Sequence, residues 1–181
     1  MPVFSDELPS IEWIPFHYSL TAKRRSGRGV HFFEDDYQFR RCWTDPDRYG
    51  ELMRKFDCVL SPDFSLYTDS PVALQIYNHY RKHWLAAFWQ TRGVHVIPTI
   101  CWSTPGRLRW CFDGEPRNSV VAVSSVGTQK HIQTRKSFIT GYYEMLEQLH
   151  PTAILFFGNV PTECTGNILQ VKPWYDKFVK S

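Results

Sequence analysis

The chain has 181 residues, of which 43% are hydrophobic and 22% charged, and its formal net charge is +3. This length predicts one domain with a sizeable core, and the composition excludes an intrinsically disordered chain. The charge is too small to indicate nucleic acid as the partner. No apolar stretch is long enough to span a membrane, so we expect no membrane partner.

The cysteines and the amino terminus indicate a reducing compartment. The five cysteines show no two-residue spacing of a zinc or redox motif, which favours reduced structural thiols. Asp6 and Glu7 interrupt the first ten residues, which carry no signal-peptide pattern. We therefore expect a cytoplasmic protein.

Helices and strands are expected to alternate along residues 46–160, between an irregular, aromatic-rich segment at 1–45 and a tail at 161–181. A helix is expected to begin at Pro46 with Thr44 or Asp45 as its cap, and another to run from Pro71 to just before Gly93, capped by Ser70. A third covers about 130–149. Buried strands are expected at 57–61, 94–101, 119–125 and 153–157. The apolar stripe of the second helix comprises Ala73, Ile76, Tyr77, Tyr80, Trp84, Ala87 and Phe88.

This alternation predicts an α/β fold: a single domain with a mainly parallel sheet and covering helices. The sheet is either open and doubly wound or a partial barrel, and the spacing leaves both alternatives open. In both, the carboxyl ends of the strands meet at one edge, where ligands bind.

Asp63, directly after the first of these strands, is the leading catalytic candidate at that edge. A partly buried carboxylate there acts as a general base or a metal ligand, or fixes the following turn by accepting backbone hydrogen bonds. Glu163 is the candidate second carboxylate for acid–base or metal chemistry. A divalent metal fits such a pair, but the sequence identifies no metal or cofactor.

The loop from Ser125 to Thr128 is the candidate phosphate site. Gly127 allows close approach of the backbone, hydroxyls and helix N–H groups can hold phosphate, and Lys130 adds charge, although hydroxyl residues before a helix also serve simply as caps. The other candidate ligand-binding residues follow the same strands: Phe64, Ser65, Trp102, Ser103 and Asn159.

Two further groups carry weaker signals. A basic, glycine-containing loop could contact the phosphates of nucleic acid or form a solvated turn; it comprises Lys23, Arg24, Arg25 and Arg28. His79 and His83 have a zinc-compatible spacing, but no glutamate follows His79, so we interpret them as boundary histidines.

Three segments together resemble a known family. They are Ser61–Tyr67, Val96–Thr99 followed by Trp102-Ser103, and Cys111–Gly114 with Ser119–Thr128. Over roughly residues 30 to 160 the chain resembles a domain-of-unknown-function family found in bacteria, phages, plasmids and other mobile elements. The resemblance transfers no catalytic residue. It implies a phage or mobile-element setting, with the host cytoplasm as the location if the protein is phage-encoded.

The leading hypothesis is a protein that binds a phosphate-bearing ligand, a nucleotide or a nucleic-acid end, at the strand edge. Gly127, Thr128 and Lys130 would hold phosphate, and Trp102 or Phe64 would stack on a base. One alternative is a metal-assisted or acid–base hydrolase using Asp63 and Glu163. The other is a non-catalytic protein that binds a host factor through the first 45 residues and Trp174-Tyr175. The sequence does not decide whether the protein is an enzyme, nor its oligomeric state.

Overall fold

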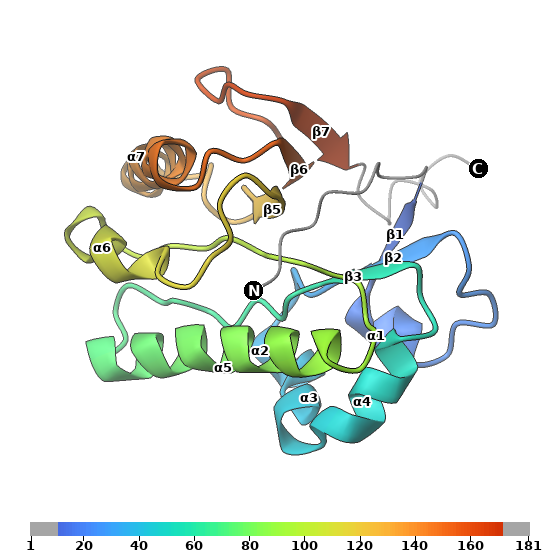
Figure 1. Ribbon diagram of the computed structural model, residues 1–181. Coiled ribbons are helices and arrows are strands. Elements are labelled where there is room, and N and C mark those ends of the chain that lie inside the picture. Colours follow the sequence, from blue (N-terminus) through green and yellow to red (C-terminus); the bar gives the residue numbers. More distant parts are fainter. Residues whose placement is uncertain (1–10, 172–181) are drawn as a thin grey trace.

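The computed structural model describes residues 11–171, and all strand pairs within them are parallel (Figure 1). The first sheet holds β1 (Glu12–Pro15), β2 (Arg28–His31), β3 (Cys58–Leu60) and β4 (Val96–Ile97) in that order. The second sheet holds β5 (Val120–Ser124), β6 (Ala153–Phe157) and β7 (Ile168–Val171). A single bridge between Thr99 and Ala122 joins the two sheets.

The strand order decides between the two alternatives. Because the strands follow one another in chain order without a reversal, the sheet lacks the switch point of a doubly wound fold. The α/β prediction is confirmed, and the order is that of a partial barrel. Across the concave side, the ring of Phe157 in β6 lies 5.7 Å from that of Trp13 in β1 and 4.8 Å from that of Phe33 after β2.

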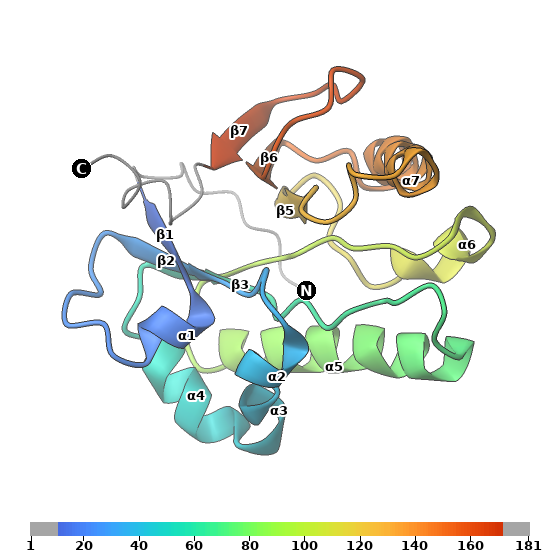
Figure 2. The ribbon, with the colours of Figure 1, turned by 180° about the vertical axis from the view of Figure 1, so that it is seen from behind.

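Two long helices cover the strands, and Figures 1 and 2 show α5 beneath the first sheet and α7 beside the second. The helices are α1 (Phe16–Ser19), α2 (Asp36–Phe39), α3 (Arg41–Thr44), α4 (Pro46–Met53), α5 (Val72–Gln90), a 3-10 turn (Pro105–Arg107), α6 (Leu108–Cys111) and α7 (Ile132–Leu149). Asp45 caps α4 as expected, accepting a hydrogen bond from the backbone of Arg48, whereas Ser70 does not cap α5, which begins at Val72. None of the described helices is long and apolar enough to cross a membrane.

Alternation along β5 and β6 divides the interior into two cores. Val120 and Ala122 face the core shared with the first sheet, whereas Val121 and Val123 pack with α7. Successive side chains of a strand point to opposite faces, so each strand serves both cores. The strands are therefore buried on both sides, as their continuous apolar sequence predicts.

The polarity of α5 is the reverse of the expected one. Its buried face carries Gln75, Asn78 and Lys82 beside Leu85, Ala86 and Trp89. The apolar stripe instead faces solvent, with Tyr77 44% and Tyr80 51% exposed. An apolar stripe normally faces the core, but here specific partners satisfy the buried polar groups instead: Gln75 donates to two backbone carbonyls and Asn78 donates to a third.

The two terminal segments contribute more than the sequence suggested. The segment 1–45, expected to be irregular, supplies β1 and β2, and the tail supplies β7. These three strands have only four residues each, which is too short for a hydrophobic periodicity that would predict them from the sequence. Trp174-Tyr175 lies outside the described residues.

Candidate functional site

A cavity of about 950 Å³ opens at the carboxyl ends of β1 to β5. This is the edge at which the alternation of strands and helices predicts a ligand. Six of the candidate residues line it: Asp63, Ser65, Trp102, Ser103, Gly127 and Thr128.

The other candidates at this edge do not line the cavity. Phe64 is buried, with the guanidinium of Arg81 3.9 Å from its ring centre. The hydroxyl of Ser125 donates to the carbonyl of Asn159 at 2.7 Å, and this hydrogen bond anchors the turn that contains Gly127 and Thr128. Lys130 is also outside the lining.

Glu163 is not brought together with Asp63. Its carboxylate accepts a hydrogen bond from Arg135 of α7 at 2.7 Å, in a half-exposed ion pair. Because Glu163 does not line the cavity, the two carboxylates do not form the pair that the hydrolase alternative requires.

Asp63 lies on the inner wall of the cavity with a shielded carboxyl group. A small part of the residue remains accessible, but Oδ1 is buried and has no hydrogen-bond partner among the described residues. Burial raises the pKa of Asp63 to about 6, although the ammonium of Lys82 opposes the change. A carboxyl group that titrates near neutrality can take up and release a proton under physiological conditions.

A second acid–base pair lies on the same cavity. Nδ1 of His17, after β1, lies 2.5 Å from Oε2 of Glu34, after β2. Burial raises the pKa of Glu34 against the lowering effect of His17. This pair was not predicted from the sequence, because neither β1 nor β2 was expected. A polar residue soon after each strand was the only available signal.

The charged residues of the described lining are mostly acidic. The lining includes the carboxylates of Glu34, Asp35 and Asp63 and the imidazole of His17, and it contains no lysine or arginine. Phosphate would therefore depend on neutral donors. Ser137 supplies such a hydroxyl from α7, and the helix dipole also favours an anion at this end, whereas the hydroxyl of Thr134 already donates to backbone carbonyls at Thr128 and His131.

Trp102 supplies a fixed aromatic surface in the lining. Its ring lies 5.2 Å from that of Phe138 and packs directly over Gly141 of α7. A Cβ at Gly141 would clash with the indole nitrogen, so the absence of a side chain there makes room for the ring. A partly exposed, immobilised indole is suited to stacking on a planar group.

A buried ion pair lies behind the wall that carries Asp63. The Lys82 ammonium, fully buried in α5, donates to Oε1 of Glu115 at 2.5 Å and to the carbonyl of Thr99 at 3.0 Å. Its Nζ also lies 3.9 Å from Sγ of Cys101, which lines the cavity. Burial alone would raise the pKa of Glu115, but Lys82 and His83 outweigh it and lower the pKa to about 2.

The basic loop lies at the opposite edge of the sheet, because it leads into the beginning of β2. Arg24 and Arg28 both donate to Oε2 of Glu12, at 2.6 and 2.8 Å. Two of its four cations thus share one carboxylate, that of the first residue of β1. The structure does not bring Lys23 or Arg25 into the cavity lining either.

Comparison with known proteins places this geometry in a family. Residues 3–174 match the model of the Domain of unknown function (DUF4417). The chain belongs to this family.

Phage proteins are among the relatives of this DUF4417 chain. The Gene 1 protein of Mycobacterium phage L5 is 40% identical over 81% of this chain and 63% of its own length. The Gene 1 protein of Mycobacterium phage D29 is 38% identical over 82% of this chain and 55% of its own length. The chain therefore spans about three-fifths of these curated relatives. No solved structure matches it significantly.

The family match confirms the resemblance seen in the sequence, including its phage connection. The segments that carried it contribute Asp63, Ser65, Trp102, Ser103, Gly127 and Thr128, the six candidates that line the cavity. The five cysteines are all unpaired, as expected from their spacing.

Proposed function

We propose that the strand-edge cavity binds a small ligand of the nucleoside or nucleotide class and that Asp63 exchanges a proton with it. One observation carries this proposal: Asp63 lines a large cavity, and its shielded Oδ1 has no partner among the described residues. An unsatisfied buried oxygen costs free energy, and a ligand hydroxyl or amine could satisfy it.

The lining offers a complementary group for each part of such a ligand. Trp102 would stack on the planar base, while Asp63 and Ser103 would hydrogen-bond to sugar hydroxyls. A phosphate would lie at the turn of Gly127 and Thr128 and at the beginning of α7. Because the described charges in the lining are acidic, one phosphate is favoured over a triphosphate.

The catalytic form of this proposal uses acid–base chemistry. Asp63 would donate or accept the proton at the reacting atom, and the His17–Glu34 pair would supply the complementary group from another wall. Glu163 has no part in it.

The test is equilibrium binding of nucleosides, nucleoside monophosphates and triphosphates to the purified chain. The variant Asp63→Asn should weaken binding of the best ligand about 10- to 100-fold, because it removes a charge-assisted hydrogen bond. Glu163→Gln is the matched control, since it neutralises a carboxylate outside the cavity. Equal affinities for the two variants, or no binding by the wild type, would refute the proposal.

A second candidate, binding of a protein partner, is supported by the solvent-facing stripe of α5. Trp43 of α3, which is partly buried, makes edge-to-face contacts with Tyr77, Tyr80 and Trp84, and these three rings are exposed. Contiguous exposed aromatics are typical of interaction surfaces.

For this candidate we expect the exchange Tyr80→Ser to abolish co-purification of a stoichiometric host protein while leaving the free energy of unfolding within about 0.5 kcal/mol. Leu169→Ser, on β7 and comparably exposed, should retain the partner. Retention of the same protein by both variants would contradict a role for the stripe.

A further inference from the structure

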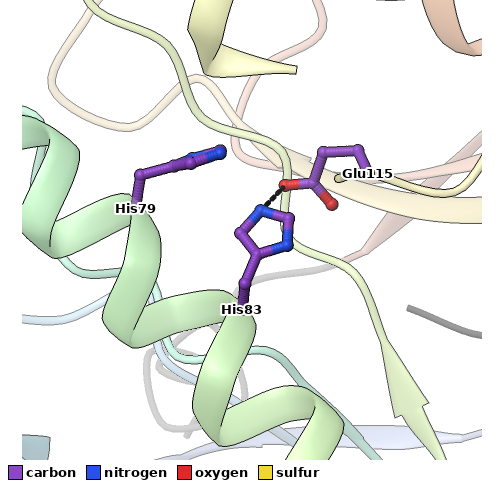
Figure 3. A group of neighbouring side chains, drawn as sticks. All are labelled: His79, His83 and Glu115. Atoms are coloured by element: carbon purple, nitrogen blue, oxygen red, sulfur yellow. Dashed lines mark ion pairs between the residues drawn. The ribbon is translucent and has the colours of Figure 1, made fainter. Parts of the chain in front are cut away.

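A second cluster of chemically active side chains lies on α5, outside the cavity lining. His79 and His83 occupy successive turns of the helix, and Glu115 approaches them from the loop after α6 (Figure 3). One ligand atom from each residue lies within 4.8 Å of the others. We propose that these three residues bind a first-row divalent metal ion of the zinc type.

Unsatisfied atoms supply the first argument. Nδ1 of His79, Nε2 of His83 and Oε2 of Glu115 are all buried without a hydrogen-bond partner among the described residues. Nε2 of His83 also lies 3.1 Å from Oε1 of Glu115, the ion pair drawn in Figure 3. Nδ1 of His79 and Oε2 of Glu115 are acceptors, and His83 in its neutral form can turn a third lone pair toward them, so one cation would satisfy all three atoms.

The tautomer of His79 supplies the second argument. Its Nε2 lies 3.0 Å from the carbonyl oxygen of Asp113, which can only accept, so Nε2 carries the proton. Nδ1 is then left with a free lone pair. A ligating histidine typically donates its other nitrogen to a carbonyl in this way, which fixes both the ring and its basicity.

The loop after α6 is shaped to deliver the carboxylate. Gly114 has a φ of +77° and would place a Cβ 3.3 Å from Nδ1 of His83, so the turn packs closely on the histidine ring. The next residue, Glu115, is completely buried at its side chain. Lys82 occupies Oε1, which leaves Oε2 for the metal.

The ligand set selects the metal class. Two imidazoles and one carboxylate suit zinc and its neighbours, whereas magnesium and calcium prefer oxygen ligands. Zinc bonds of about 2.0–2.1 Å require ligand atoms roughly 3.4 Å apart. The three ligand atoms already lie within 4.8 Å of one another, so small rotations of the two imidazole rings would bring them to this spacing. Water would complete a tetrahedron, and the nearby ammonium makes binding weaker than at a closed four-ligand site.

The experiment titrates metal-free full-length protein with Zn²⁺ and, in parallel, with Co²⁺ as a spectroscopic probe. The wild type should bind one equivalent, and Co²⁺ should give visible d–d bands without a thiolate charge-transfer band. His79→Gln and His83→Gln should each weaken Zn²⁺ binding more than about 100-fold, beyond the usual effect of an outer-shell change. If one of the two variants fails to fold, the other still measures the effect of removing a ligand.

The control variants are His95→Gln and His131→Gln, which alter exposed histidines away from the cluster. Both should bind Zn²⁺ as the wild type does. A charge-transfer band would assign the metal to cysteine and overturn the proposal. So would unchanged affinity in folded His79→Gln and His83→Gln, or the absence of a stoichiometric Zn²⁺ complex. Because no cluster residue lines the cavity, these results are independent of those for the nucleotide ligand.

Discussion

Replacing Lys82 with methionine should lower the free energy of unfolding at pH 7 by about 3–5 kcal/mol, because it leaves the Glu115 carboxylate buried without its cation. Urea denaturation monitored by circular dichroism measures the change. Lys55→Met, an exposed lysine on the surface, should change the same quantity by no more than about 0.5 kcal/mol. A loss for Lys82→Met as small as that of the control would show that the pair contributes little.

The double variant Lys82→Met/Glu115→Leu distinguishes the lost pair from a merely disturbed helix. Buried ion pairs can be replaced by apolar residues at little cost, so the double variant should recover most of the stability. The pH dependence provides a further check. The folded-state pKa of Glu115, about 2, lies below its ordinary 4.5, so its stabilising contribution is present above pH 4.5 and is lost as the pH falls through 2. At pH 3 Glu115 can be protonated in Lys82→Met, so the loss should be smaller than at pH 7.

Asp63→Asn should instead stabilise the protein, by about 1–3 kcal/mol above pH 6. Burial raises the pKa of Asp63 from 3.8 to about 6, so the folded state binds the proton more tightly than the unfolded state. The corresponding stability is complete below pH 3.8 and is lost as the pH rises through 6. Asparagine cannot ionise, so the variant does not lose this stability as the pH rises. Chemical denaturation between pH 4 and pH 8 measures the difference between the variant and the wild type.

Asp69→Asn, at an exposed position, is the control and should follow the wild type at every pH. A variant Asp63→Asn that is less stable than the wild type at pH 8 would mean that the ionised carboxylate is held by structural contacts. A gain in stability with a loss of ligand affinity would instead identify Asp63 as a residue maintained for function.

The sequence predicted the middle of the fold and one wall of the site well. Long apolar runs at 119–125 and 153–157 correspond to β5 and β6, and the strand-edge rule placed Asp63, Trp102 and Gly127 on one cavity. Such runs are reliable because a strand buried on both faces needs nearly continuous apolar residues.

The remainder depends on contacts between distant residues. The four-residue strands β1 and β2 are defined by their pairing rather than by periodicity, and with them the His17–Glu34 pair was missed. The orientation of α5 was misjudged because Lys82 is stabilised by Glu115, 33 residues later in the chain. The same separation explains why the sequence did not place Glu115 beside His79 and His83. A pattern within a short stretch of sequence cannot predict contacts with residues so far away in the chain.

The single bridge between Thr99 and Ala122 has a mechanical consequence. Two backbone hydrogen bonds surround it, from Ile100 to Ala122 and from Ala122 to Pro98, each 2.8 Å long. The cavity is built from both sides of this seam, with Asp63 on the first sheet and Gly127 on the second. Apart from this bridge the two sheets are held together by side-chain packing, so a ligand that touches both walls would add direct links between them, and occupancy of the cavity would make the pair of sheets more rigid.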